Sequence, residues 1–191
     1  MNVRLKVSRE RNFSAHHMLL RIAAAALEDA EKKQPGWFSA QFTAMTMSAL
    51  SLEAICNAVG ERVMADWKDF ESASPTAKLR LICQQTGIEY NRNKEPWATA
   101  CWLSRFRNAI AHAKPEFVKQ DVVWTEEEYE RRRSEYPKST LEAEITLGNA
   151  RRAVRGMDKI KDLLCEKIPA ENRLGLYSDA WTGSAKMAND D

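Results

Sequence analysis

Six residues from Arg107 to His112 combine side chains suited to acid–base and phosphate chemistry, and they read Arg-Asn-Ala-Ile-Ala-His. His112 is one of three histidines, and a histidine can accept or donate a proton near neutral pH. An arginine stays charged and offers a planar fork of donors that fits phosphate oxygens. Asn108 can orient the imidazole or donate to an oxyanion. Together these side chains suit RNA phosphodiester cleavage without a metal ion, with a base on the ribose 2′-hydroxyl and a cation on the phosphorane.

The motif lies near the C-terminal end of a helix that is predicted over residues 96–114. At about 100° per residue, Asn108 and His112 are neighbours on one face of this helix, and Arg105 lies on the same flank. Arg107 is about 140° from His112 around a straight helix. A helix distortion, or a second copy of the site from a partner chain, would help to bring the guanidinium to the imidazole.

The spacing of Arg107, Asn108 and His112 resembles the R-polar-x-x-x-H motif of HEPN-domain proteins. That family has a bundle of four or more helices, and many members are metal-independent endoribonucleases of toxin–antitoxin, phage-defence or RNA-processing systems. They commonly act as homodimers in which two motifs face one another. The resemblance implies catalytic roles for Arg107 and His112 with Asn108 between them, an RNA substrate, and an antitoxin or regulatory protein as partner. Some active members carry a tyrosine where this chain has Lys114.

Each motif residue also has a simpler interpretation. His112 could be a histidine that interacts favourably with the C-terminal end of a helix dipole. Arg107 could be a surface arginine paired with a carboxylate. The alternative function is accordingly a non-catalytic, HEPN-like module that binds a nucleotide or a protein. An enzyme should bring both copies of Arg107 and His112 into one open basic cleft, whereas a binding module should bury or separate them.

Glu53 and Asn57 interrupt a partly apolar stripe on the second predicted helix. Burying them without partners would be costly. They lie either at the rim of the bundle, where they meet water or each other, or on a face that packs against the helix of the motif. In the second arrangement Glu53 contacts Arg107 or His112, and it would orient the arginine or raise the histidine pKa. Glu53, Asn57 and Arg105 are therefore candidate supporting residues.

Two basic clusters could follow an RNA backbone. Residues 131–133 are arginines that lie beside several glutamates, so a solvated helix with internal ion pairs is the simpler interpretation. Arg151, Arg152 and Arg155 lie on the last predicted helix and are the better candidates for RNA contact.

Apolar periodicity predicts an all-α, HEPN-like helical bundle of four main helices with additional short helices. The second helix has the clearest pattern, with apolar residues at alternating spacings of four and three from Phe38 to Val63. Domain boundaries are expected as an N-terminal extension over residues 1–13, the bundle over 14–169 and a C-terminal tail over 170–191, much of which is expected to be loose after Tyr177. The helices are expected over residues 14–33, 38–64, 75–87, 96–114, 126–133 and 141–167.

Composition is that of an ordinary globular protein. The chain has 191 residues, of which 44% are apolar and 29% charged, and its net charge of +2 does not demand a nucleic-acid partner. Its four cysteines form no CxxC pair, which gives no support for a zinc site, and three of them lie in apolar helical patterns, which fits reduced cysteines in a reducing compartment. Neither a signal peptide nor a membrane span is recognised in the sequence. We therefore expect a cytoplasmic protein with no cofactor, no metal and no membrane association.

Overall fold

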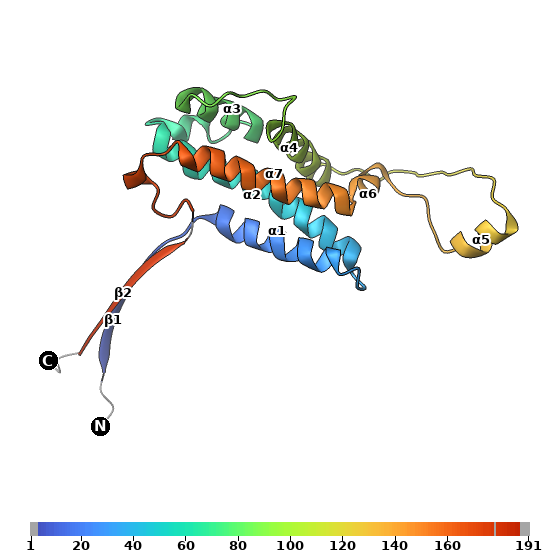
Figure 1. Cartoon of the computed structure of the whole chain (residues 1–191), viewed down its shortest axis with the longest axis horizontal. Helices are drawn as coiled ribbons and strands as arrows, with labels where there is room; N and C mark the ends of the chain where they lie inside the picture. The colour runs from blue at the N-terminus through green and yellow to red at the C-terminus, as the bar shows by residue number, and fades with distance from the viewer. Residues whose placement is uncertain (1–3, 178, 188–191) are drawn as a thin grey trace.

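The computed structural model describes residues 4–177 and 179–187, and these residues are mainly helical (Figure 1). Two strands, β1 (Leu5–Asn12) and β2 (Ala180–Met187), form a small antiparallel sheet. The helices are α1 Ala15–Glu31, α2 Trp37–Val63, α3 Pro75–Thr86, α4 Trp97–Ala111, α5 Glu126–Arg132, α6 Thr140–Glu144 and α7 Leu147–Glu166. The predominantly helical fold that the sequence predicts is therefore confirmed, and the sheet is an addition to it.

Helix α2 is the centre of the bundle, and it packs against α1, α3, α4 and α7. The predicted apolar seam is buried at Met45, Ala49, Leu52, Cys56 and Val59. By length and composition α2 could also cross a membrane, but half of its apolar window is buried among the other helices. This burial is consistent with the core helix of a soluble protein.

The last predicted helix, residues 141–167, is divided into α6 and α7 in the structure. The chain is extended at Thr146, whose hydroxyl accepts a hydrogen bond of 3.1 Å from the backbone N–H of Asn149 and thereby caps α7. Ile145 remains buried at 5% exposure, so the apolar pattern continues across the break. Apolar spacing alone does not reveal such a break, because the buried Ile145 lies in the connection between the two helices and continues the apolar pattern of α7.

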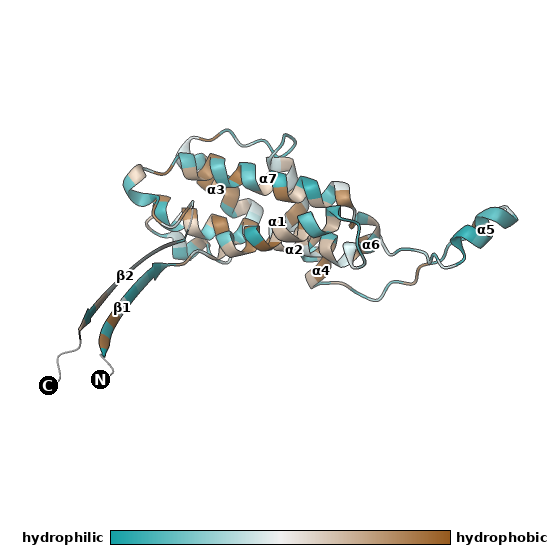
Figure 2. Ribbon diagram, turned by 60° about the horizontal axis from the view of Figure 1, so that its bottom comes forward, coloured by the Kyte–Doolittle hydropathy of each residue, from teal (hydrophilic) through white to brown (hydrophobic). Residues whose placement is uncertain are grey.

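A long connection between α4 and α6 carries α5 away from the bundle (Figure 1). The Thr125 hydroxyl and the Glu128 carboxylate form a capping box at the start of α5. None of the described residues of this helix is buried, and Figure 2 shows that it is hydrophilic along its length. The interpretation of the charged segment as a solvated helix is confirmed.

The predicted loose tail is wrong for residues 180–187. They form β2, which pairs along its whole length with β1, from Leu5 opposite Met187 to Asn12 opposite Ala180. This ribbon projects from one end of the bundle (Figure 1), and all of β1 is exposed. Local sequence pattern does not predict it, because the two strands are separated by the whole helical bundle.

The bundle also extends beyond its predicted end at residue 169. Leu176 is fully buried, and Arg62 of α2 donates to the carbonyl oxygens of Asn172 and Leu174 at 3.0 and 3.1 Å. The carbonyl oxygen of Leu176 lies 3.0 Å from Nε2 of the buried His16. Because a carbonyl can only accept, this ring nitrogen of His16 must donate. These contacts fix the base of the ribbon to α1 and α2.

Acidification should destabilise the bundle through His16. Burial lowers the His16 pKa most, and the nearby positive charges of His17, Arg62 and Lys161 lower it further. The hydrogen bond to the Leu176 carbonyl raises it, and together these causes bring the His16 pKa from 6.5 to about 4. The unfolded chain therefore binds a proton as the pH falls through 6.5, while the folded chain does so only near 4. The contribution of neutral His16 to the free energy of unfolding is thus present above pH 6.5 and is lost as the pH falls toward 4.

Between about pH 7.5 and about pH 5, this one residue should remove about 2 kcal/mol from the free energy of unfolding. Urea titrations at the two pH values measure the loss. The variant His16→Gln keeps a side-chain donor but cannot titrate, so its loss should be smaller by that amount. Equal losses in the two proteins would contradict a neutral, buried His16.

Candidate functional site

The motif residues lie on the last two turns of α4, which is held in the bundle by the buried side chains of Leu103 and Phe106. The helix ends at Ala111, and His112 is its C-cap, with backbone angles of φ −117° and ψ 21°. The backbone N–H of His112 still donates to the carbonyl oxygen of Asn108 at 3.0 Å. The His112 side chain is exposed, so its imidazole is open to water.

Arg107 is held by two neighbours. One of its terminal nitrogens lies 3.6 Å from a carboxylate oxygen of Glu53 on α2, and the other donates to the side-chain oxygen of Asn108 at 3.1 Å. The predicted contact between Glu53 and the motif is confirmed, and it is made with the arginine. The Arg107 side chain is 41% exposed, so its guanidinium can still meet a ligand from solvent.

Lys78 of α3 is part of the same group, and sequence reasoning missed it. Its side chain is 1% exposed, and its ammonium lies 3.0 Å from the second carboxylate oxygen of Glu53. A buried charge needs such a partner. Glu53 therefore connects a buried cation on α3 to an exposed cation on α4. No local pattern marks Lys78, because the residues that bury it belong to other helices.

Asn57 does not join this group. Its side-chain oxygen is buried and has no hydrogen-bond partner within the part of the chain that the structure describes. The suggestion that Glu53 and Asn57 satisfy each other is therefore wrong, because Glu53 contacts Lys78 and Arg107 instead.

Asn108 and His112 border different cavities. Asn108 and Arg105 line a cavity of about 500 Å³ between α3 and α4. His112 lines another of about 530 Å³, which includes Glu116 and Glu144. The structure of one chain therefore does not bring Arg107 and His112 into a common cleft, although both side chains reach solvent.

Two of the three arginines predicted to contact RNA have structural partners. Arg151 lies 2.7 Å from a carboxylate oxygen of Glu31 on α1. Arg152 lies 2.8 Å from Glu95, and its guanidinium stacks over the Trp102 ring at 5.2 Å. These contacts join α7 to α1 and α4, so both arginines help to hold the bundle together.

Arg155 differs from the other two arginines of this cluster. Among the described residues no carboxylate pairs with it, and it lines a cavity of about 210 Å³ together with Lys159. Of the predicted RNA-contact cluster, Arg155 is thus the arginine without a carboxylate partner among the described residues, although Glu95 also lines its cavity.

Comparison with protein-family models, curated protein sequences and solved structures finds no match to the chain. Within residues 4–177 and 179–187, no group of three or more His, Cys, Asp or Glu side chains is placed to hold a metal ion. The resemblance of the Arg107–His112 motif to the HEPN family therefore stays a prediction.

Proposed function

We propose that this chain is a HEPN-type endoribonuclease that cleaves RNA without a metal ion and acts as a homodimer. The observation that supports the proposal is the arrangement at the end of α4, where the Glu53 carboxylate lies 3.6 Å from the Arg107 guanidinium while the His112 imidazole is open to water. The proposal includes a cytoplasmic location and a role in a toxin–antitoxin or phage-defence system, with a regulatory protein as partner.

In this mechanism, His112 accepts the proton of a ribose 2′-hydroxyl, and the 2′-oxygen bonds to phosphorus as the bond from phosphorus to the 5′-oxygen breaks. The protonated His112 then returns a proton to the leaving 5′-oxygen, which leaves a 2′,3′-cyclic phosphate, and Arg107 neutralises the charge that develops on the phosphate. Asn108 and Glu53 are positioning residues, since both hold the guanidinium rather than touch the substrate. Because Arg107 and the cavity beside His112 lie apart in one chain, each dimer site would take its arginine from one copy and its histidine from the other.

The test is incubation of the purified protein with mixed single-stranded RNA in EDTA. The wild-type chain should cleave the RNA, and His112→Ala should leave the RNA intact because it lacks the general base. His17→Ala is the matched control, since it removes an imidazole that contacts Gly175 at the base of the ribbon. Equal cleavage by wild type and His112→Ala, or no cleavage by the wild type, would overturn the proposal.

A second function, a non-catalytic binding module, is favoured by a different observation. Arg107 already has a carboxylate partner, and Asn108 and His112 border separate cavities. The same experiment separates the two functions when RNA binding is measured alongside cleavage. A module would bind RNA or a nucleotide without cleaving it, and His112→Ala would bind as the wild type does.

A further inference from the structure

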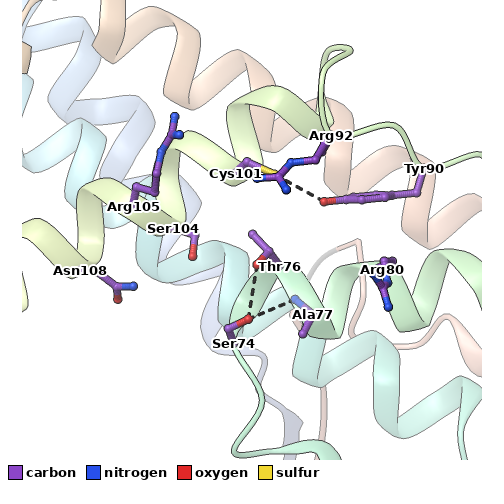
Figure 3. A pocket seen from close by; sticks show the side chains of 10 residues that line it. All are labelled: Ser74, Thr76, Ala77, Arg80, Tyr90, Arg92, Cys101, Ser104, Arg105 and Asn108. Carbon is purple, nitrogen blue, oxygen red and sulfur yellow. Dashed lines mark hydrogen bonds between the residues drawn. The ribbon is translucent and has the colours of Figure 1, made fainter.

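The cavity of about 500 Å³ beside Asn108 is lined by positively charged residues and by no negatively charged one. We call it the arginine pocket, because Arg80 of α3, Arg92 of the following loop and Arg105 of α4 all line it (Figure 3). No carboxylate is among its lining residues. Three segments of the chain thus contribute one arginine each to the wall of the pocket, and in Figure 3 Arg105 and Ser104 point in opposite directions from α4.

These three arginines are exposed and lie without a partner in the part of the chain that the structure describes. The structure records neither a hydrogen bond nor an ion pair for any of their side chains within residues 4–177 and 179–187. Elsewhere in the bundle, Arg107, Arg151 and Arg152 each pair with a carboxylate. A folded chain that gathers unpaired guanidinium groups around one cavity has donors ready for an external anion.

The floor of the pocket adds hydroxyl donors. Ser104 of α4 is only 8% exposed, and its hydroxyl has no hydrogen-bond partner among the described residues. Figure 3 shows its oxygen directed into the space between α4 and the start of α3. Across this space lie Ser74 and Thr76, whose hydroxyl oxygens are 3.3 Å apart. They belong to the first turn of α3, where the helix dipole favours negative charge.

Apart from Asn108, the rest of the wall is largely apolar. Ala77 of α3 and Cys101 of α4 line it, and the Tyr90 ring lies beside Cys101, with its hydroxyl 3.4 Å from the sulfur. A volume of about 500 Å³ is far larger than one phosphate requires and lies within the range of pockets for small organic ligands. The pocket therefore offers arginines for a phosphate and an apolar surface for the organic group to which the phosphate is attached.

We infer that the arginine pocket binds the phosphate group of a nucleotide, either free in solution or at the end of an RNA strand. A phosphomonoester carries close to two negative charges at neutral pH, which three arginines can neutralise. The ribose and base would lie against Ala77, Cys101 and the Tyr90 ring. Neither Arg107 nor His112 lines the pocket, although the positioning residue Asn108 does, so nucleotide binding there can be tested separately from RNA cleavage.

Calorimetric titration of the full chain with adenosine monophosphate and with adenosine tests the inference. The nucleotide should bind at least about tenfold more tightly than the nucleoside, because charge-assisted hydrogen bonds form only with the phosphate. Arg80→Ala and Arg92→Ala should each weaken nucleotide binding about tenfold. Arg131→Ala on α5 removes the same charge outside the pocket and should bind as the wild type.

Three further measurements define the outcome. Side-chain NMR signals of Arg80, Arg92 and Arg105 should shift in the wild-type chain when the nucleotide is added, and this readout does not depend on how the variants fold. Preference for 5′-phosphorylated over 5′-hydroxyl RNA identifies a strand end as the ligand, whereas binding of the mononucleotide alone identifies a free nucleotide. His112→Ala should keep the nucleotide affinity, which separates this site from the proposed nuclease. Equal affinity for nucleotide and nucleoside, with unshifted arginine signals, would overturn the inference.

Discussion

Chains with Arg107→Ala and chains with His112→Ala, each inactive alone, should together recover about a quarter of the wild-type cleavage rate. The reason is the geometry of a two-fold dimer in which each site takes one group from each copy. Random pairing makes about half of the dimers mixed, and each mixed dimer contains one intact site and one that lacks both groups. Recovery is expected because Arg107 and His112 do not share a cavity within one chain.

The experiment mixes equal amounts of the two variants, unfolds and refolds them together, and measures the initial rate of RNA cleavage in EDTA. Two batches of His112→Ala treated in the same way provide the control and should stay inactive. If the mixed variants also stay inactive while the refolded wild type is active, Arg107 and His112 act within one chain, and the prediction of a site formed by two copies is wrong.

Replacing Glu53 by glutamine should lower the free energy of unfolding by about 3 kcal/mol, because it leaves the Lys78 ammonium buried without a counter-charge. The Lys78 side chain is 1% exposed, so water cannot take the place of the carboxylate. The estimate is at the lower end for a broken buried pair, since the Glu53 side chain is itself 32% exposed.

Urea unfolding of Glu53→Gln, Lys78→Met and the double variant measures this effect. The double variant should recover most of the lost stability, because methionine fills the same volume without a charge. Arg107→Ala removes the other, exposed partner of Glu53 and should change stability by less than about 1 kcal/mol. If Glu53→Gln is no less stable than Arg107→Ala, Lys78 does not depend on this carboxylate.

Structural features that are formed by residues close together in the sequence were predictable from it. The alternating spacing along α2 identifies the seam that is buried at Met45, Leu52 and Cys56. The Ser74–Pro75 pair marks the start of α3, where the Ser74 hydroxyl accepts a hydrogen bond from the backbone N–H of Ala77. For Glu53 the sequence left two arrangements open, at the rim of the bundle or against Arg107 or His112, and the structure shows the contact with Arg107.

Features that depend on distant segments were not predictable in this way. Lys78 is an ordinary surface residue type, and only the packing of α3 against α2 shows that it is buried beside Glu53. The arginine pocket combines α3, a loop and α4, so no single stretch of sequence contains it. The ribbon pairs Leu5 with Met187, which are among the most distant described positions in the chain.

This pairing of distant strands has a consequence for the order in which the molecule assembles during synthesis. β1 leaves the ribosome first, but its partner β2 follows only after every helix has been made. Helices α1 to α7 can therefore pack together while β1 still presents an unpaired edge. Closing so long a loop comes after local contacts have formed, so the ribbon joins the molecule last. Because it projects from the bundle, it can also separate again without opening the core.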